Sequence, residues 1–257
     1  MSRIDTIFKN GHKAIIPFIV AGDPSIEITE ATILSLDKAG ADIIEIGIPF
    51  SDPIADGPVI AASMHRALTN GVTSSDAIAA VSRIRDTVSA GIVAMVSHSI
   101  VRKNGSKAYI DQLVEAGFDG IIIPDIDSSE AEELSAYCLT LDFSFTMLIA
   151  PTTPKERIQQ LANVSFGFLY VLARTGLTGE HADLPDLTSR IAEIRDVTSL
   201  PLAVGFGISN SEHVLPVQKI ADAAIVGSAL VRTMQEADDP VTAAGQFLLG
   251  ITPKDLA

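Results

Sequence analysis

Eight short apolar runs, rich in Ile and Val, divide this chain of 257 residues and restrict its possible folds more than any other feature. Between them lie stretches with the apolar spacing of amphipathic helices, such as ITEATILSLDKAG (28–40) and SKAYIDQLVEAG (106–117). Strands that alternate with helices predict a parallel sheet, because a parallel neighbour is reached only by a crossover. The runs are 14–20, 42–48, 91–97, 119–125, 143–149, 166–172, 200–206 and 223–227.

Three connections repeat one design, in which a helix ends, the chain turns, and a strand starts with an aspartate at or near its head. They are KAGADIIEI (38–46), EAGFDGIII (115–123) and KIADAAIVG (219–227). Gly40 and Gly117 fit the left-handed position just after a helix. Eight such units in about 250 residues match the (β/α)8 TIM barrel.

We therefore expect one TIM-barrel domain over 1–257, with an extra N-terminal helix in 1–12 across the barrel bottom and a short last helix after 238. A doubly wound sheet is the rival fold, and its dinucleotide fingerprint is Gly-x-Gly-x-x-Gly after an early strand. The nearest match is late in the chain, where Gly205 and Gly207 are followed by Asn210 instead of a third glycine. The barrel is therefore the favoured prediction.

Charge and composition exclude several classes of protein. The chain has 18 basic and 32 acidic side chains, a net charge of −14, which opposes binding to nucleic acid. Its one cysteine, Cys138, allows neither an intrachain disulfide nor a cysteine zinc cluster. The first residues lack an apolar signal core, and the run 14–20 is shorter than the roughly 20 residues of a membrane helix. We expect a soluble, cytoplasmic protein that binds no membrane.

Glu45 is the first candidate for catalysis. In the second run Ile43, Glu45 and Gly47 alternate with an all-Ile face that must pack on helices, so Glu45 is predicted to point into the barrel. Burial opposes ionisation and should raise its pKa toward neutrality, which suits a proton carrier. A structural glutamate held by a buried donor is the alternative interpretation.

Two long loops follow strands at the end of a barrel that carries active sites. The segment 47–60 (GIPFSDPIADGPVI) contains Asp52 and Asp56, which could also be ordinary turn residues. The segment 173–185 (ARTGLTGEHADLP) is either a lid or a surface loop. Tyr170 is expected to share a strand face with Phe166 and Phe168, as a core residue or a ligand contact.

The third candidate site is a phosphate site. GFGIS (205–209) and GSALV (227–231) follow the last two strands, where this fold often binds phosphate. Glycines let backbone N–H groups approach an anion, Ser228 adds a hydroxyl, and a helix N-terminus favours negative charge. The alternative is glycine used only for tight turns.

Two other chemistries have no residues to support them. A Schiff-base aldolase needs a strand lysine, and every lysine lies outside the apolar runs. The 5 histidines show no pair at metal-ligand spacing, so we expect no metal site.

These segments together carry a resemblance to the tryptophan synthase α subunit. The matching stretches run in order over nearly the whole chain, and 45–58 is the most specific of them. They are EIGIPFSDPIADGP (45–58), Pro124 with Asp125, APTTPKERI (150–158), ARTGLTG (173–179), GFGIS and GSALV.

The resemblance implies a lyase of tryptophan biosynthesis that cleaves indole-3-glycerol phosphate to indole and glyceraldehyde 3-phosphate in a retro-aldol step. Glu45 matches the principal acid/base, and Asp56 matches the second catalytic carboxylate. Thr178 matches the lid threonine, Tyr170 a tyrosine near the glycerol chain, and Phe206 an aromatic residue of the indole pocket. The positions that match the phosphate site are Gly179, Gly207, Gly227 and Ser228.

The resemblance also implies a partner, the β subunit, in an αββα heterotetramer. Pyridoxal phosphate would belong to that partner, and this chain would need no cofactor. Asp52 and Pro53 lie in a loop expected to communicate with it. Two stretches near the expected contact depart from the family. Where the family usually has Tyr-x-Asn, this chain has Ser-His-Ser at 97–99, and where it usually has Pro-Asp-Leu-Pro, this chain has Ile126 and Asp127 in the last two places.

Two other functions remain possible from the residues. Another phosphate-binding barrel, such as a sugar-phosphate isomerase or epimerase, would explain the glycine loops but not 45–58. A catalytically silent or weakly catalytic subunit that only activates the β subunit would suit the altered barrel mouth, although both carboxylates are retained.

Overall fold

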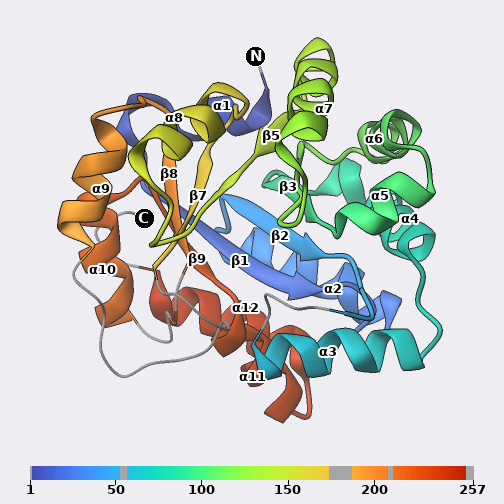
Figure 1. The fold of residues 1–257 in the computed structure, drawn as a ribbon. Helices are drawn as coiled ribbons and strands as arrows, with labels where there is room; N and C mark the ends of the chain where they lie inside the picture. The colour runs from blue at the N-terminus through green and yellow to red at the C-terminus, as the bar shows by residue number, and fades with distance from the viewer. Residues whose placement is uncertain (1, 53–56, 174–186, 206, 208–210, 253–257) are drawn as a thin grey trace.

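The computed structural model describes residues 2–52, 57–173, 187–205, 207 and 211–252, and its strands form one parallel barrel (Figure 1). The sheet order is β5-β4-β3-β2-β1-β9-β8-β7-β6. The strands are β1 (Ala14–Val20), β2 (Ile43–Gly47), β3 (Gly91–Met95), β4 (Gly120–Ile122), β5 (Ser144–Thr146), β6 (Leu148–Ile149), β7 (Leu169–Leu172), β8 (Leu202–Gly205) and β9 (Ala223–Val226).

β5 and β6 together occupy the fifth strand position of the expected barrel. The expected run 143–149 is interrupted at Met147, so that β5 pairs with β4 and β6 pairs with β7. Tyr170 N–H donates to the Met147 carbonyl at 3.0 Å, and Met147 N–H donates to Ser165 Oγ at 3.2 Å. The two ends of the sheet order therefore meet at Met147, which confirms the TIM barrel.

Helices surround the barrel (Figure 1). The amino-terminal helix α1 (Arg3–Ile7) and the last helix, α12 (Pro240–Ile251), confirm the two expected additions. The other elements are α2 (Ile26–Lys38), α3 (Pro58–Thr69), α4 (Ser74–Ile84), α5 (His98–Lys103), α6 (Ser106–Glu115), α7 (Ser128–Thr140), α8 (Lys155–Asn163), α9 (Thr188–Arg195), α10 (Ser211–Ile220), α11 (Ser228–Glu236) and the 3₁₀ turns Lys9–Gly11 and Arg85–Thr87.

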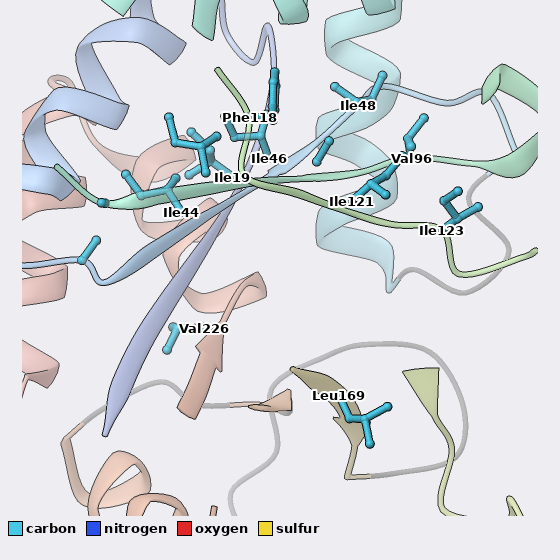
Figure 2. Close-up of a cluster of buried hydrophobic side chains, with 14 of the residues drawn as sticks. Ile19, Ile44, Ile46, Ile48, Val96, Phe118, Ile121, Ile123, Leu169 and Val226 are labelled. Atoms are coloured by element: carbon cyan, nitrogen blue, oxygen red, sulfur yellow. The ribbon is translucent and has the colours of Figure 1, made fainter. Parts of the chain in front are cut away.

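The larger core lies between the strands and the helices (Figure 2). Ile44, Ile46 and Ile48 of the second strand region are at most 1% exposed and belong to it, as the alternation predicts. A second cluster fills the barrel itself and includes Ile43, with Ile4 of α1. Strand residues of opposite parity thus separate into two cores.

The repeated aspartates fasten each strand start to the strand before it. Asp42, Asp119 and Asp222 each accept a hydrogen bond of 2.8 Å through one carboxylate oxygen. The donors are the N–H groups of Ile15, Ile92 and Leu202. Gly40 and Gly117, with φ of 90° and 89°, take the predicted left-handed conformation, which an L side chain rarely adopts.

One predicted face is wrong. Phe168 and Tyr170 belong to the barrel interior, whereas Phe166 packs against the outer core. Gly167 has φ of 88° and lies between Phe166 and the start of β7, so the simple alternation of a strand does not extend back to Phe166.

Among the described residues, no helix is both long and apolar enough to cross a membrane. The same residues contain no group of three or more His, Cys, Asp or Glu side chains placed to hold a metal ion.

Candidate active site

Glu45 lies inside the barrel, at the centre of β2. It is 0% exposed, and its neighbours in the parallel register are Phe18 on β1 and Val93 on β3. Val93 belongs to the interior cluster, while Ile44 and Ile46 on either side of Glu45 belong to the outer core. The strand therefore directs this one acidic side chain inward, where a bound molecule at the barrel mouth could exchange a proton with it.

Phe18 forms an aromatic wall above Glu45, at the end of the barrel where the strands finish. A Cβ built on Gly47 would lie 2.6 Å from Phe18 Cζ, so the ring covers the backbone at the end of β2. The nearest heavy atom to a Cβ at Gly227 is Phe18 Cβ, at 3.6 Å. The ring therefore spans the ends of β2 and β9, and only glycine at 47 leaves it room.

Tyr170 occupies the opposite side of the interior, on β7. It is 8% exposed and packs in the interior cluster. A Cβ on Gly205 of the neighbouring strand would lie 2.6 Å from Tyr170 Oη and Cε1. The phenol group therefore lies against the end of β8, close to the loop that was predicted to bind phosphate.

The two glycine turns of the predicted phosphate site follow adjacent strands. Gly205 at the end of β8 pairs in register with Ile225 of β9, so the turns containing Gly207 and Gly227 begin side by side. Gly227 is the residue before α11, and Ser228 is the first residue of that helix. The free N–H groups of the first turn of α11 thus face the same end of the barrel, a common environment for an anion.

Of the remaining predicted residues, the structure describes only Asp52. Asp52 is exposed, in the segment after β2. The other predicted residues of the site lie outside the described residues: Pro53, Asp56, Thr178, Gly179 and Phe206.

Sequence reasoning missed Phe18 and the ion pair between Asp23 and Arg66. Phe18 shares strand parity with Ile16, an interior residue, but the run 14–20 is wholly apolar and gives no reason to single out one member. Asp23, after β1, accepts from Arg66 Nε at 2.9 Å and Nη2 at 2.6 Å. The hydrogen bond with Asp23 raises the pKa of Arg66, and the pair fastens α3 to the end of β1.

The segments 97–99 and 124–127, near the expected partner contact, are joined to each other. Asp125, after β4, accepts from Ser97 Oγ at 2.8 Å and from His98 N–H at 2.7 Å. His98 is 6% exposed, and its Nε2 lies 3.2 Å from Glu130 on α7. Side chains on neighbouring strand ends therefore fix this part of the mouth as one unit.

Comparison with known proteins gives a consistent result. A family model described as tryptophan synthase alpha chain matches residues 4–249. The tryptophan synthase alpha chain of Rhodopirellula baltica is 40% identical over 95% of this chain and 91% of its own length, and that of Rippkaea orientalis is 41% identical over 91% and 89%.

Solved structures agree with the sequence relatives. The tryptophan synthase subunit alpha of Legionella pneumophila superposes with a TM-score of 0.89 at 35% identity, covering 98% of this chain and 97% of that one. A chain from Mycobacterium tuberculosis tryptophan synthase gives 0.87 at 31% identity, covering 96% and 95%. The chain with Glu45 inside its barrel therefore belongs to the tryptophan synthase alpha chain family.

Proposed function

We propose that this chain is a carbon–carbon lyase that cleaves indole-3-glycerol phosphate to indole and glyceraldehyde 3-phosphate. Family membership gives it a role in tryptophan biosynthesis. The observation that carries the proposed reaction is the fully buried Glu45, the acidic residue of β2, directed into the interior beneath the barrel mouth. A carboxyl group in such a position can donate and accept protons away from bulk water.

In the proposed reaction Glu45 is the principal acid/base. A proton placed on C3 of the indole ring gives an indolenine, which takes up the electron pair when the bond to the glycerol chain breaks. Glu45, acting as the base, removes a proton from the glycerol hydroxyl, and the aldehyde forms. The substrate is thus its own electron sink, so the chain needs neither a Schiff-base lysine nor a metal ion.

Asp56 is proposed to stabilise the positive charge that develops at the indole nitrogen. It lies two residues before α3, the helix that Arg66 fastens to Asp23. Two proton-transfer groups in different surroundings can hold different protonation states at one pH. Thr178 is the proposed lid residue that closes over this pair.

The phosphate of the substrate is proposed to bind at Gly179, Gly207, Gly227 and Ser228. For a chain of net charge −14, such a local arrangement of N–H donors is needed to hold an anion. The pairing of β8 with β9 supports this assignment for the two glycine turns. Tyr170 and Phe206 are proposed to contact the glycerol chain and the indole ring.

The proposed partner is the β subunit of tryptophan synthase, in an αββα assembly located in the cytoplasm. Pyridoxal phosphate is assigned to that partner, and this chain is proposed to work without a cofactor. Asp52 and Pro53 are proposed contacts. We further propose that the segments joined by the hydrogen bonds of Ser97 and His98 to Asp125 adapt this part of the mouth to the β subunit of the same organism.

The test is an assay of both products from indole-3-glycerol phosphate, with and without that β subunit. We expect indole and glyceraldehyde 3-phosphate in equal amounts, and loss of both in Asp56→Asn. The exposed Glu132 on α7 supplies a control, because Glu132→Gln should leave the rate unchanged. Activation of the β subunit without any indole formation would contradict the proposal and favour a silent subunit.

A further inference from the structure

A cavity of about 610 Å³ lies away from Glu45, between α3, α11 and the loop after β1. Figure 1 shows α3 and α11 side by side, and the two helices are in contact. One wall is apolar and includes Val20, Val231 and Met234, which are 3%, 4% and 8% exposed. The volume lies in the range of small-molecule sites, about 300–1,000 Å³.

A second wall is polar and already organised. Asp23 and Arg66, both lining residues, form the ion pair that joins the β1–α2 loop to α3, and Ser63 also donates to Asp23. Only 11% of the Asp23 side chain is exposed. The hydrogen bonds shown within the described residues use Nε and Nη2 of Arg66, so the N–H groups of Nη1 are left for a ligand.

These walls define the chemistry of the ligand. The lining includes Asp23 and Asp238 against a single guanidinium group, so an anion would meet a net negative wall. A neutral acceptor such as an amide carbonyl can use the Arg66 donors without that repulsion. The apolar wall requires that most of the ligand be apolar, because water displaced from it is the main gain on binding.

The lining of the cavity packs against side chains at the barrel mouth. Val20 and Val231 belong to a small apolar cluster with Phe18, the ring that covers Gly47 and approaches Gly227. α11 begins at Ser228, a proposed phosphate ligand, and α3 begins two residues after Asp56. A molecule between these helices therefore contacts the two elements that support the proposed site.

We propose that this cavity is a second small-molecule site, which takes a neutral, mainly apolar ligand with one carbonyl-type acceptor and alters the reaction at the barrel mouth. A ligand shifts an equilibrium between two states of a protein only if it binds them with different affinities. Here the two states would differ in the spacing of α3 and α11. The first half of the proposal, that a ligand binds (the binding half), rests on the cavity alone. The second half, that the ligand alters the reaction (the regulatory half), rests on the proposed function.

The binding half is tested with acetanilide, a neutral phenyl amide, and with chain labelled at its methionine methyl groups. Met234 lines the cavity, Met64 belongs to the Phe18 cluster, and Met147 lies at the break between β5 and β6. We expect a saturable NMR shift at Met234, a smaller one at Met64 and none at Met147. Propylbenzene, which lacks the acceptor, and phenylacetate, an anion, should each bind about tenfold more weakly.

A pair of variants on α11 controls for binding elsewhere. Gln235 is exposed and lines the cavity, whereas Glu236 is exposed and does not line it. Gln235→Trp should fill the space and abolish the Met234 shift, and Glu236→Trp should leave it. Absence of any Met234 shift, an equal shift in both variants, or equal binding of phenylacetate would overturn the site.

The regulatory half is tested by steady-state kinetics at a saturating concentration of acetanilide. We expect KM for indole-3-glycerol phosphate or kcat to change at least about threefold in the natural chain and to stay constant in Gln235→Trp. Unchanged KM and kcat with the cavity occupied would overturn the regulatory half alone. A chain that forms no indole even without acetanilide would contradict the proposed function instead, so the two failures are distinguishable.

Discussion

At the scale of single residues, the ring of Tyr170 and the missing side chain of Gly205 fit each other. A Cβ at position 205 would lie 2.6 Å from both Cε1 and Oη of Tyr170, well inside ordinary contact distance. Tyr170 is confined in the barrel interior, where close packing leaves little room for the ring to move. The glycine thus fixes the position of a proposed substrate contact.

Gly205→Ala should therefore displace the Tyr170 ring. We expect a loss of about 1–3 kcal/mol in the free energy of unfolding, as for other overpacked sites, and a raised KM for indole-3-glycerol phosphate. Urea unfolding and steady-state kinetics measure the two effects.

The matched control for that variant is Gly250→Ala on α12, where a new Cβ meets nothing within 4 Å. This change should leave KM unaltered and stabilise the chain by up to about 1 kcal/mol, because alanine favours a helix. Equal effects of the two substitutions would show that contact with Tyr170 is not the cause.

The residues that line or flank the barrel interior differ in how well the sequence predicts their positions. Glu45 could be predicted because it is one acidic residue on an alternating apolar strand, and the structure places it where alternation requires. Phe18 could not, since all of β1 is apolar and buried. Phe166 was assigned to the wrong face because a positive φ at Gly167 is a backbone feature that side-chain periodicity does not report.

At the scale of elements, the repeated aspartates at the strand starts each accept an equivalent hydrogen bond from the strand before, but the pKa values of Asp119 and Asp222 are shifted in opposite directions. Burial raises the pKa of Asp119, and the Ile92 N–H and the charge of Arg3 oppose it only in part. Burial alone would also raise the pKa of Asp222. There the Leu202 N–H and Arg195, with the charge of Lys13, outweigh burial and hold the pKa below its ordinary value of 3.8.

Asp222 and Asp119 should consequently affect acid stability in opposite directions. A lowered pKa in the folded state contributes stability that is present above the ordinary value of 3.8 and is lost as the pH falls through the folded value. A raised pKa contributes stability that is present at low pH and is lost as the pH rises.

Urea unfolding at about pH 6 and about pH 3 measures this difference. Relative to the natural chain, Asp222→Asn should show a smaller loss of unfolding free energy on acidification, and Asp119→Asn a larger one. Shifts of the same sign in both variants would contradict the assignment of the two environments.

Most elements could be predicted from periodicity, and the exceptions have physical causes. All eight runs contain strands, but β4 covers only Gly120–Ile122 of the run 119–125. The break between β5 and β6 depends on a hydrogen bond from Met147 N–H to Ser165, a residue 18 positions away. Side-chain bonds of this range leave no local pattern in a sequence.

At the scale of the whole molecule, α1 closes the bottom of the barrel opposite the proposed site. Ile4 is 0% exposed and belongs to the interior cluster, and a Cβ at Gly91 would lie 2.7 Å from its Cδ1. Arg3 adds hydrogen bonds to the carbonyls of Val88 and Ser89. The interior below Glu45 is thereby filled by side chains, which leaves ligand access at the other end.

Ile4→Ala should create a cavity at this closed end. We expect a loss of about 2–5 kcal/mol in the free energy of unfolding, from the lost burial and the unfilled space. In contrast, Leu139→Ala on α7 removes a side chain that is 62% exposed, and the change should be within about 0.5 kcal/mol. Similar losses in the two variants, measured by urea unfolding, would show that α1 does not close the interior.

The relation between distant helices is the part of the molecule that the sequence did not reveal. The barrel follows from the alternation of strands and helices, and the proposed phosphate loops follow from their position after the last strands. The Asp23–Arg66 pair and the cavity beside it join segments 43 positions apart. Neither residue belongs to a recognisable motif, so only the packing of α3 against the loop after β1 reveals the pair.

The central claim is that the buried carboxyl group of Glu45 transfers protons to the substrate. It is tested most directly by the single-turnover rate of indole formation, with the chain and its β subunit in excess over indole-3-glycerol phosphate. The account predicts that Glu45→Gln, which keeps the size of the side chain, lowers this rate at least about 100-fold, while Glu132→Gln leaves it unchanged. A folded Glu45→Gln variant that retains the natural rate within about twofold would contradict the account.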